Sequence, residues 1–109
     1  MNADEAALAE VAAIVDRGGD ADDVLRGVLA ALQHAGIAYA ALRFVERGAL
    51  VDGPSIGDEQ PAAKVDVTYE GEKVGELAVA AERTFAERVA AQIAPFVLVG
   101  WDTGGEPWV

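Results

Sequence analysis

The chain has 109 residues, one His and no Cys, and its 8 Lys and Arg against 19 Asp and Glu give a formal net charge of -11. This length suits one domain with one hydrophobic core, so we expect a single domain over residues 1–109. The negative charge argues against a nucleic-acid partner, and the lack of Cys excludes disulfides, thiolate nucleophiles and cysteine-bound metals.

The sequence indicates neither a signal peptide nor a membrane span. Its N-terminal part is rich in Asp and Glu and lacks an apolar run of signal-peptide type. No stretch approaches the roughly 18 uninterrupted apolar residues that a membrane-spanning helix needs. We therefore expect a soluble, cytoplasmic protein without a membrane partner.

Two helices are predicted first. The segment Ala3–Arg17 has apolar residues at helical spacing and ends at the glycine pair 18–19. Asp20 then stands at the N-cap position of a second helix that ends near Gly36. Acidic residues at the front of this helix suit the positive end of its dipole.

Two hairpins are expected next. Ile37–Glu46 is apolar at successive positions, which is typical of a central strand, and a turn at 47–48 leads into a partner strand over 49–52. The glycines and prolines of residues 53–61 predict a loop. The second hairpin has alternating Val65, Val67 and Tyr69, a turn at 70–73, and a strand over 74–81.

The last predicted helix runs to about Val99 and presents a broad apolar face. Pro95 lies inside this pattern, so we expect a kink or an early stop near Ala94. Together the elements predict an α+β fold, with an antiparallel sheet of about four strands and with the N-terminal helices and the C-terminal helix packed on one face.

The order helix, helix, hairpin, loop, hairpin, helix resembles that of a GAF domain over nearly the whole chain. The residues that carry the resemblance lie in the second hairpin and the final helix: Val67, Tyr69, Gly71, Val74, Gly75, Leu77, Val79, Arg83, Thr84, Phe85, Arg88, Val89, Ala90, Gln92, Ile93 and Ala94. The resemblance implies a compact, shortened, stand-alone member of the family. Such a domain acts as a non-enzymatic regulatory or sensory module in signal transduction, by binding a small molecule or by homodimerisation.

The chain also departs from the GAF pattern. Members of the family usually carry a long excursion between the two hairpins that roofs the ligand pocket, whereas about a dozen residues remain here. A short roof implies a shallow pocket. The family's cyclic-nucleotide motifs, bilin-attaching cysteine and sulfoxide-reducing cysteines have no matching positions, so we expect no cofactor.

A ligand would be held on the open face of the sheet by polar side chains. The candidate binding residues are Tyr39, Arg43, Ser55 and Tyr69. Arg43 is the best single candidate, and an ordinary salt bridge to a neighbouring carboxylate is the alternative. The loop glycines add backbone N–H groups of the kind that bind anions.

Homodimerisation would use a seam of terminal helices. The candidate interface residues are Leu8, Val11, Val15, Val97, Leu98 and Trp101. The same residues could instead fill the core of one chain, because periodicity alone does not separate these two roles. A purely structural dimerisation domain therefore stays open beside the sensory module.

Catalytic and metal chemistry finds little support. His34, the only histidine, falls at the end of the second helix, where a cation suits the helix dipole. Ser55 is the only serine, and its surroundings do not match a nucleophile elbow. We expect no metal and no catalytic residues, and a small carboxylate-dependent hydrolase or isomerase is the enzyme alternative.

Overall fold

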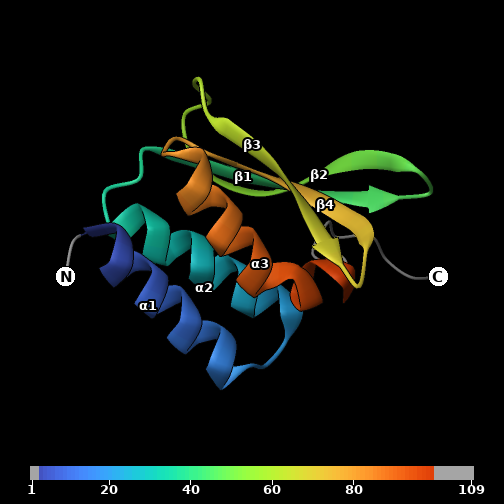
Figure 1. The fold of residues 1–109 in the computed structure, drawn as a ribbon, viewed down its shortest axis with the longest axis horizontal. Coiled ribbons are helices and arrows are strands. Elements are labelled where there is room, and N and C mark those ends of the chain that lie inside the picture. The colour runs from blue at the N-terminus through green and yellow to red at the C-terminus, as the bar shows by residue number, and fades with distance from the viewer. Residues whose placement is uncertain (1–2, 100–109) are drawn as a thin grey trace.

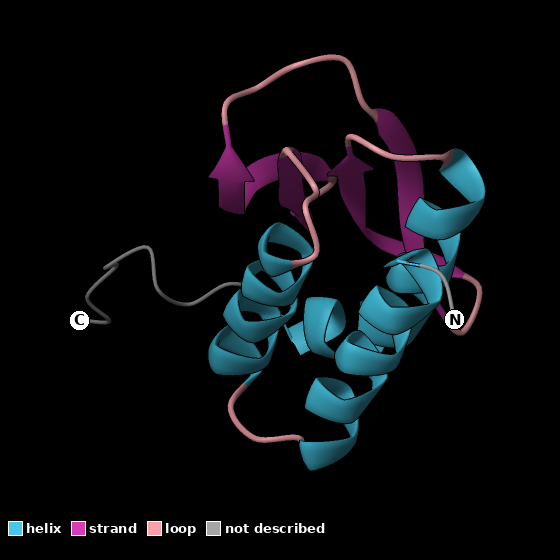
Figure 2. Ribbon diagram, turned by 90° about the vertical axis from the view of Figure 1, so that its left-hand side faces the viewer, coloured by secondary structure: helices cyan, strands magenta, loops and turns pink. Residues whose placement is uncertain are grey.

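Three helices pack on one face of a four-stranded antiparallel sheet in the computed structural model, which describes residues 3–99 (Figures 1 and 2). The elements are, in order, α1 (Ala3–Arg17), α2 (Ala21–His34), β1 (Tyr39–Glu46), β2 (Ala49–Gly57), β3 (Ala63–Tyr69), β4 (Glu72–Val79) and α3 (Arg83–Val99). The predicted α+β fold class is confirmed.

The strand order β2-β1-β4-β3 joins the two hairpins through the antiparallel pairing of β1 with β4. Each hairpin closes in a two-residue turn whose residues both have positive φ, Arg47 (53°) and Gly48 (80°) in one and Glu70 (52°) and Gly71 (85°) in the other. Such turns match the right-handed twist of the flanking strands. The local turns thus bring each pair of strands together, and the β1–β4 pairing makes one sheet.

The core lies between the sheet and the helices. Leu42 of β1, Leu77 of β4 and Val65 of β3 are cross-strand neighbours, and all three are buried. α3 packs on β3 and β4, α2 packs on β1 and β2, and α1 packs on the other two helices. The fully buried large side chains come from both layers: Phe44, Leu25, Leu32, Leu42, Leu77, Ile93, Val11, Val28, Val67, Val79, Val89 and Val97.

The predicted loop over residues 53–61 is wrong in its first part, because β2 continues to Gly57. β2 is an edge strand, where the missing N–H of Pro54 is tolerated. The pairing register shifts between Ala41 and Arg43, which accommodates an extra residue of β2. Gly53 lies under the Phe44 ring, and a Cβ there would collide with it.

The predicted end of the last helix at about Val99 is confirmed, because α3 continues through Pro95 to Val99. Of the two effects predicted for Pro95, a kink or an early stop near Ala94, the early stop does not occur. Pro95 faces solvent, whereas Val97 is 2% exposed. A Cβ on Gly75 of β4 would lie 2.7 Å from the Cγ1 of Val97. Packing of Val97 against this glycine offsets the hydrogen bond that the proline removes.

We expect Gly75→Ala to lower the free energy of unfolding by about 2 to 3 kcal/mol, because the added methyl would collide with the backbone oxygen of Arg43 on β1 and with the side chain of Val97 on α3. Gly71→Ala is the matched control. It has no neighbour within 4 Å of the added Cβ but keeps a φ of +85°, so it should cost only about 1 kcal/mol. Urea unfolding of both variants measures this, and equal losses would contradict the close packing of β1 and α3 around Gly75.

Candidate functional site

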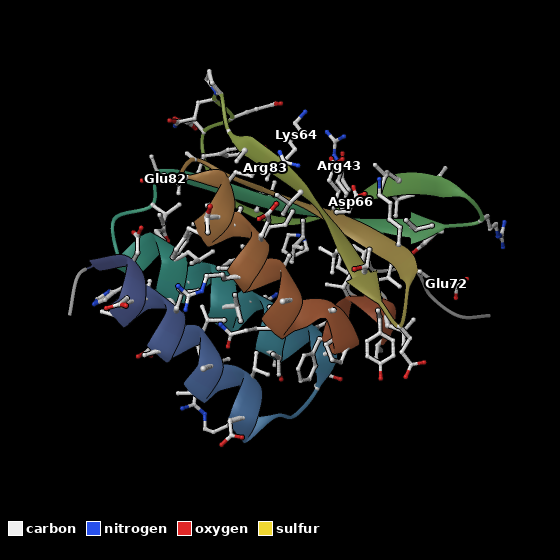
Figure 3. All side chains as sticks on the ribbon, viewed as in Figure 1. Arg43, Lys64, Asp66, Glu72, Glu82 and Arg83 are labelled. Carbon is white, nitrogen blue, oxygen red and sulfur yellow. The ribbon has the colours of Figure 1, made fainter. Side chains whose placement is uncertain are left out.

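The face of the sheet that points away from the helices is the candidate site. Along β1, Ala40, Leu42 and Phe44 are buried toward the helices, so Tyr39, Ala41 and Arg43 point to the other side. Figure 3 shows the side chains of Arg43 and Lys64 projecting from the sheet on this open face.

Cross-strand pairing aligns the open-face residues of all four strands into rows. One row is made mostly of small residues and runs Ser55, Ala41, Ala78, Lys64 from β2 to β3. The next row is charged and runs Asp52, Arg43, Glu76, Asp66. The open face is therefore recessed along the row of small residues, and long polar side chains border this recess.

A hollow of about 380 Å³ lies over β1 and β2 on this face. Its lining residues are Tyr39, Ala41, Leu42, Arg43, Asp52, Gly53, Ser55, Gly57 and Glu59. A smaller dent beside it shares Tyr39, Ala41, Arg43 and Glu59 and adds residues of β3 and β4, namely Lys64, Glu76 and Ala78. The hollow and the dent together form the open-face site.

The open-face site carries charges of both signs. The Nε of Arg43 lies 3.2 Å from the Oδ1 of Asp52, with 44% and 89% of the two side chains exposed. At the β3 end of the same charged row, Lys73 Nζ lies 3.2 Å from Asp66 Oδ1. A guanidinium has five N–H donors, and the pair with Asp52 engages the Nε end, so Arg43 can also donate to a ligand.

Three of the four predicted binding residues meet at this site. Tyr39, Arg43 and Ser55 all line the hollow. Tyr69 does not join them, because it alternates in register with Val65 and Val67 and packs against the hydrophobic core. The structure places it on the helix side of the sheet.

Sequence reasoning missed Lys64 and Glu76 of the open-face site. Lys64 and Glu76 reach it only through the pairing of β4 with β1 and β3, which joins segments far apart in the chain. The small side chains of Ala41 and Ala78 were the available signal, since alanines at facing positions of paired strands leave the sheet face low.

Most of the predicted dimer seam lies inside the core of the single chain. Leu8, Val11 and Val97 are buried, and Val15 is partly buried against them. These residues fill the core, which is the alternative that the sequence left open. Leu98 is 52% exposed, and Trp101 lies outside the described residues.

The structure does not assemble the serine and histidine into one site. His34 ends α2 in the helix layer, whereas Ser55 faces the opposite side of the sheet. Within residues 3–99 no group of three or more His, Asp or Glu side chains is placed to hold a metal ion. No helix in this range is long and apolar enough to cross a membrane.

No family model, curated protein sequence or solved structure matches this chain significantly. The functional argument below therefore starts from the geometry of the open-face site.

We expect the open-face site to contribute little to stability. Arg43→Met should change the free energy of unfolding by less than about 1 kcal/mol, because an exposed ion pair is screened by water. Leu42→Ala, one residue away on the buried face, should cost about 2 to 5 kcal/mol. Chemical denaturation measures both, and a loss at Arg43 as large as that at Leu42 would show that the ion pair holds the fold.

Proposed function

We propose that this chain is a non-enzymatic regulatory module of the GAF type that binds a small polar molecule at the open-face site. The observation that carries the proposal is the hollow of about 380 Å³ with Tyr39, Arg43 and Ser55 on its lining. Ligand pockets commonly enclose roughly 300 to 1,000 Å³ and orient the ligand by a few polar groups. A phenol, a guanidinium and a hydroxyl supply both donors and acceptors here.

The two faces of the sheet differ in their contribution to stability, and this difference supports the same proposal. The helices and the core stabilise one face, so the other face is free to vary in chemistry without loss of the fold. The resemblance to GAF domains adds a regulatory role in signal transduction. The connection over 58–62 stands where that family has its roofing excursion, and Glu59 of this connection lines the rim of the hollow.

The state of Asp52, the acid beside Arg43, favours binding over catalysis. The Asp52 side chain is 89% exposed and is already paired with Arg43. A general acid or base is usually a carboxylate or imidazole that burial or a like charge has tuned for proton transfer. An exposed acid held by a guanidinium is better suited to orienting a bound molecule.

We expect one metabolite class in a screen of nucleotides and metabolites to raise the thermal stability of the chain. A ligand at 100 times its dissociation constant stabilises the native state by about 2.7 kcal/mol. Ala41→Leu should abolish this stabilisation, because the larger side chain fills the floor of the hollow. Ala12→Leu on the exposed surface of α1 is the control and should keep it. Equal stabilisation of both variants by the ligand would show that the ligand binds outside the open-face site.

Pairing of two copies is a second candidate function, and the end of α3 favours it. Leu98 is 52% exposed and Val99 is 73% exposed, so two large apolar side chains of the last helical turn face solvent. Apolar surface of this kind is often covered by another chain. This pairing would also serve a purely structural dimerisation domain.

Light scattering at micromolar concentration tests the pairing. We expect a mass of twice the 11.3 kDa of one chain for the natural sequence, and a single-chain mass for Leu98→Glu, because the charge cannot be buried unpaired. Ala91→Glu, at another exposed position of α3, should remain paired. A single-chain mass for the natural sequence would rule out dimerisation at this concentration.

A further inference from the structure

The charged groups of the open-face site differ in whether the fold already satisfies them. Arg43 is paired with Asp52. Lys64, Glu59 and Glu76 form no ion pair with any residue in the range 3–99. Lys64, Glu59 and Glu76 nevertheless line one dent beside the hollow. The site thus offers one free cation and two free carboxylates to whatever binds there.

The sign of these charges restricts the class of ligand. A simple anion that met Lys64 and Arg43 would also face the carboxylates of Asp52, Glu59 and Glu76, in a chain of net charge -11. A simple cation would face both basic side chains. Like charges brought together on binding cost free energy, and such repulsion excludes wrong partners.

We infer that the open-face site takes a small zwitterion, a molecule that carries one carboxylate and one ammonium group, such as a free amino acid. The inference rests on the proposed function and adds the ligand class to it. The carboxylate of the ligand accepts hydrogen bonds from Lys64 and from the Nη groups of Arg43. Its ammonium group donates to Glu76 and Glu59, and no net charge is added to the site.

The dent encloses only about 20 Å³, so the carbon skeleton of such a ligand would lie in the adjoining hollow of about 380 Å³, and its charged ends would reach the side chains at the dent. Ala41 and Ala78 are cross-strand neighbours between Arg43 and Glu76 on one side and Tyr39 on the other. Small residues at these positions leave room for the short carbon chain that separates the two charges of an amino acid. The Tyr39 ring offers an aromatic wall, which is a favourable neighbour for an ammonium group.

The test compares three forms of the same compounds. The probes are the standard amino acids with uncharged side chains, their N-acetyl forms, which are anions, and their amides, which are cations. Binding is read from the chemical-shift changes of the backbone amides of Ala41 and Ala78 in a titration. We expect at least one free amino acid to bind, and both of its blocked forms to bind at least about 10-fold more weakly, because each lost charge-assisted hydrogen bond costs about 1.5 to 3 kcal/mol.

Variants that each remove one charge test which residue contacts the carboxylate of the ligand and which contacts its ammonium group. Lys64→Met should lower the affinity for the free amino acid about 10-fold and leave the affinity for the amide unchanged. Glu76→Gln should lower the affinity for the free amino acid and leave the affinity for the N-acetyl form unchanged. Arg88→Met and Glu10→Gln remove the same charges from the exposed helix layer and should have no effect.

The outcomes separate the inference from the proposed function. Equal binding of the free and blocked forms at Ala41 and Ala78 would overturn the inference of a zwitterionic ligand but would leave the proposed binding site in place. Absence of amino-acid binding would also overturn it, and the proposed function would then stand only if another metabolite shifts the same amides. If no compound shifts these amides, both the zwitterion inference and the proposed ligand-binding function are contradicted.

Discussion

Alternation of large apolar residues with small or charged residues along β1 and β4 is the constraint on which the rest of the structure depends. Leu42 and Leu77 face each other on the helix side, whereas Ala41 and Ala78 face each other on the open side. Burying the large side chains under α2 and α3 supplies the main driving force for folding. The helices consequently cover one face only, and the face with small side chains is left as a shallow, polar surface.

The open-face site follows from this alternation together with the strand order. β1 and β4 are the central strands, so their small residues lie in the middle of the sheet and their charged residues lie in the next row. The edge strands add Asp52 and Ser55 on one side and Lys64 and Asp66 on the other. Oppositely charged side chains from four strands therefore meet above a floor of alanines, which is the arrangement that the proposed ligand would recognise.

Local signals in the sequence were sufficient for most of the fold. The bounds of α1 follow from helical periodicity, and Gly48 and Gly71, which tolerate positive φ, marked the two turns. The second turn is shorter than the predicted 70–73, because β4 already begins at Glu72. The second half of β2 was missed because Gly53 and Pro54 are turn formers, and their acceptance in a strand depends on its edge position and on a register shift. The end of α3 near Val99 was predicted from its apolar pattern, whereas the contact of Val97 with Gly75 of β4, which favours helix over an early stop at Pro95, is nonlocal.

The candidate site was predictable where it depends on one strand and not where it depends on pairing. Tyr39 and Arg43 share a parity along β1, and the period of two places them on one face. The same rule places Tyr69 with Val65 and Val67 in the core, a signal that the sequence contained. Lys64 and Glu76 could not be assigned, because their neighbours are fixed by the nonlocal β1–β4 pairing.

The central claim, that one face of the sheet is sealed by helices and the other is open, is tested most directly by thiol labelling, since the chain has no Cys of its own. Ala40→Cys places a thiol on the buried face, and Ser55→Cys places one on the open face at an exposed position. The account predicts that Ser55→Cys reacts with a maleimide nearly as fast as the urea-unfolded chain. It predicts that the reaction of Ala40→Cys is at least about 1,000-fold slower, because its thiol is exposed only on unfolding. Protection of Ser55→Cys, or free reaction of Ala40→Cys in the native state, would contradict it.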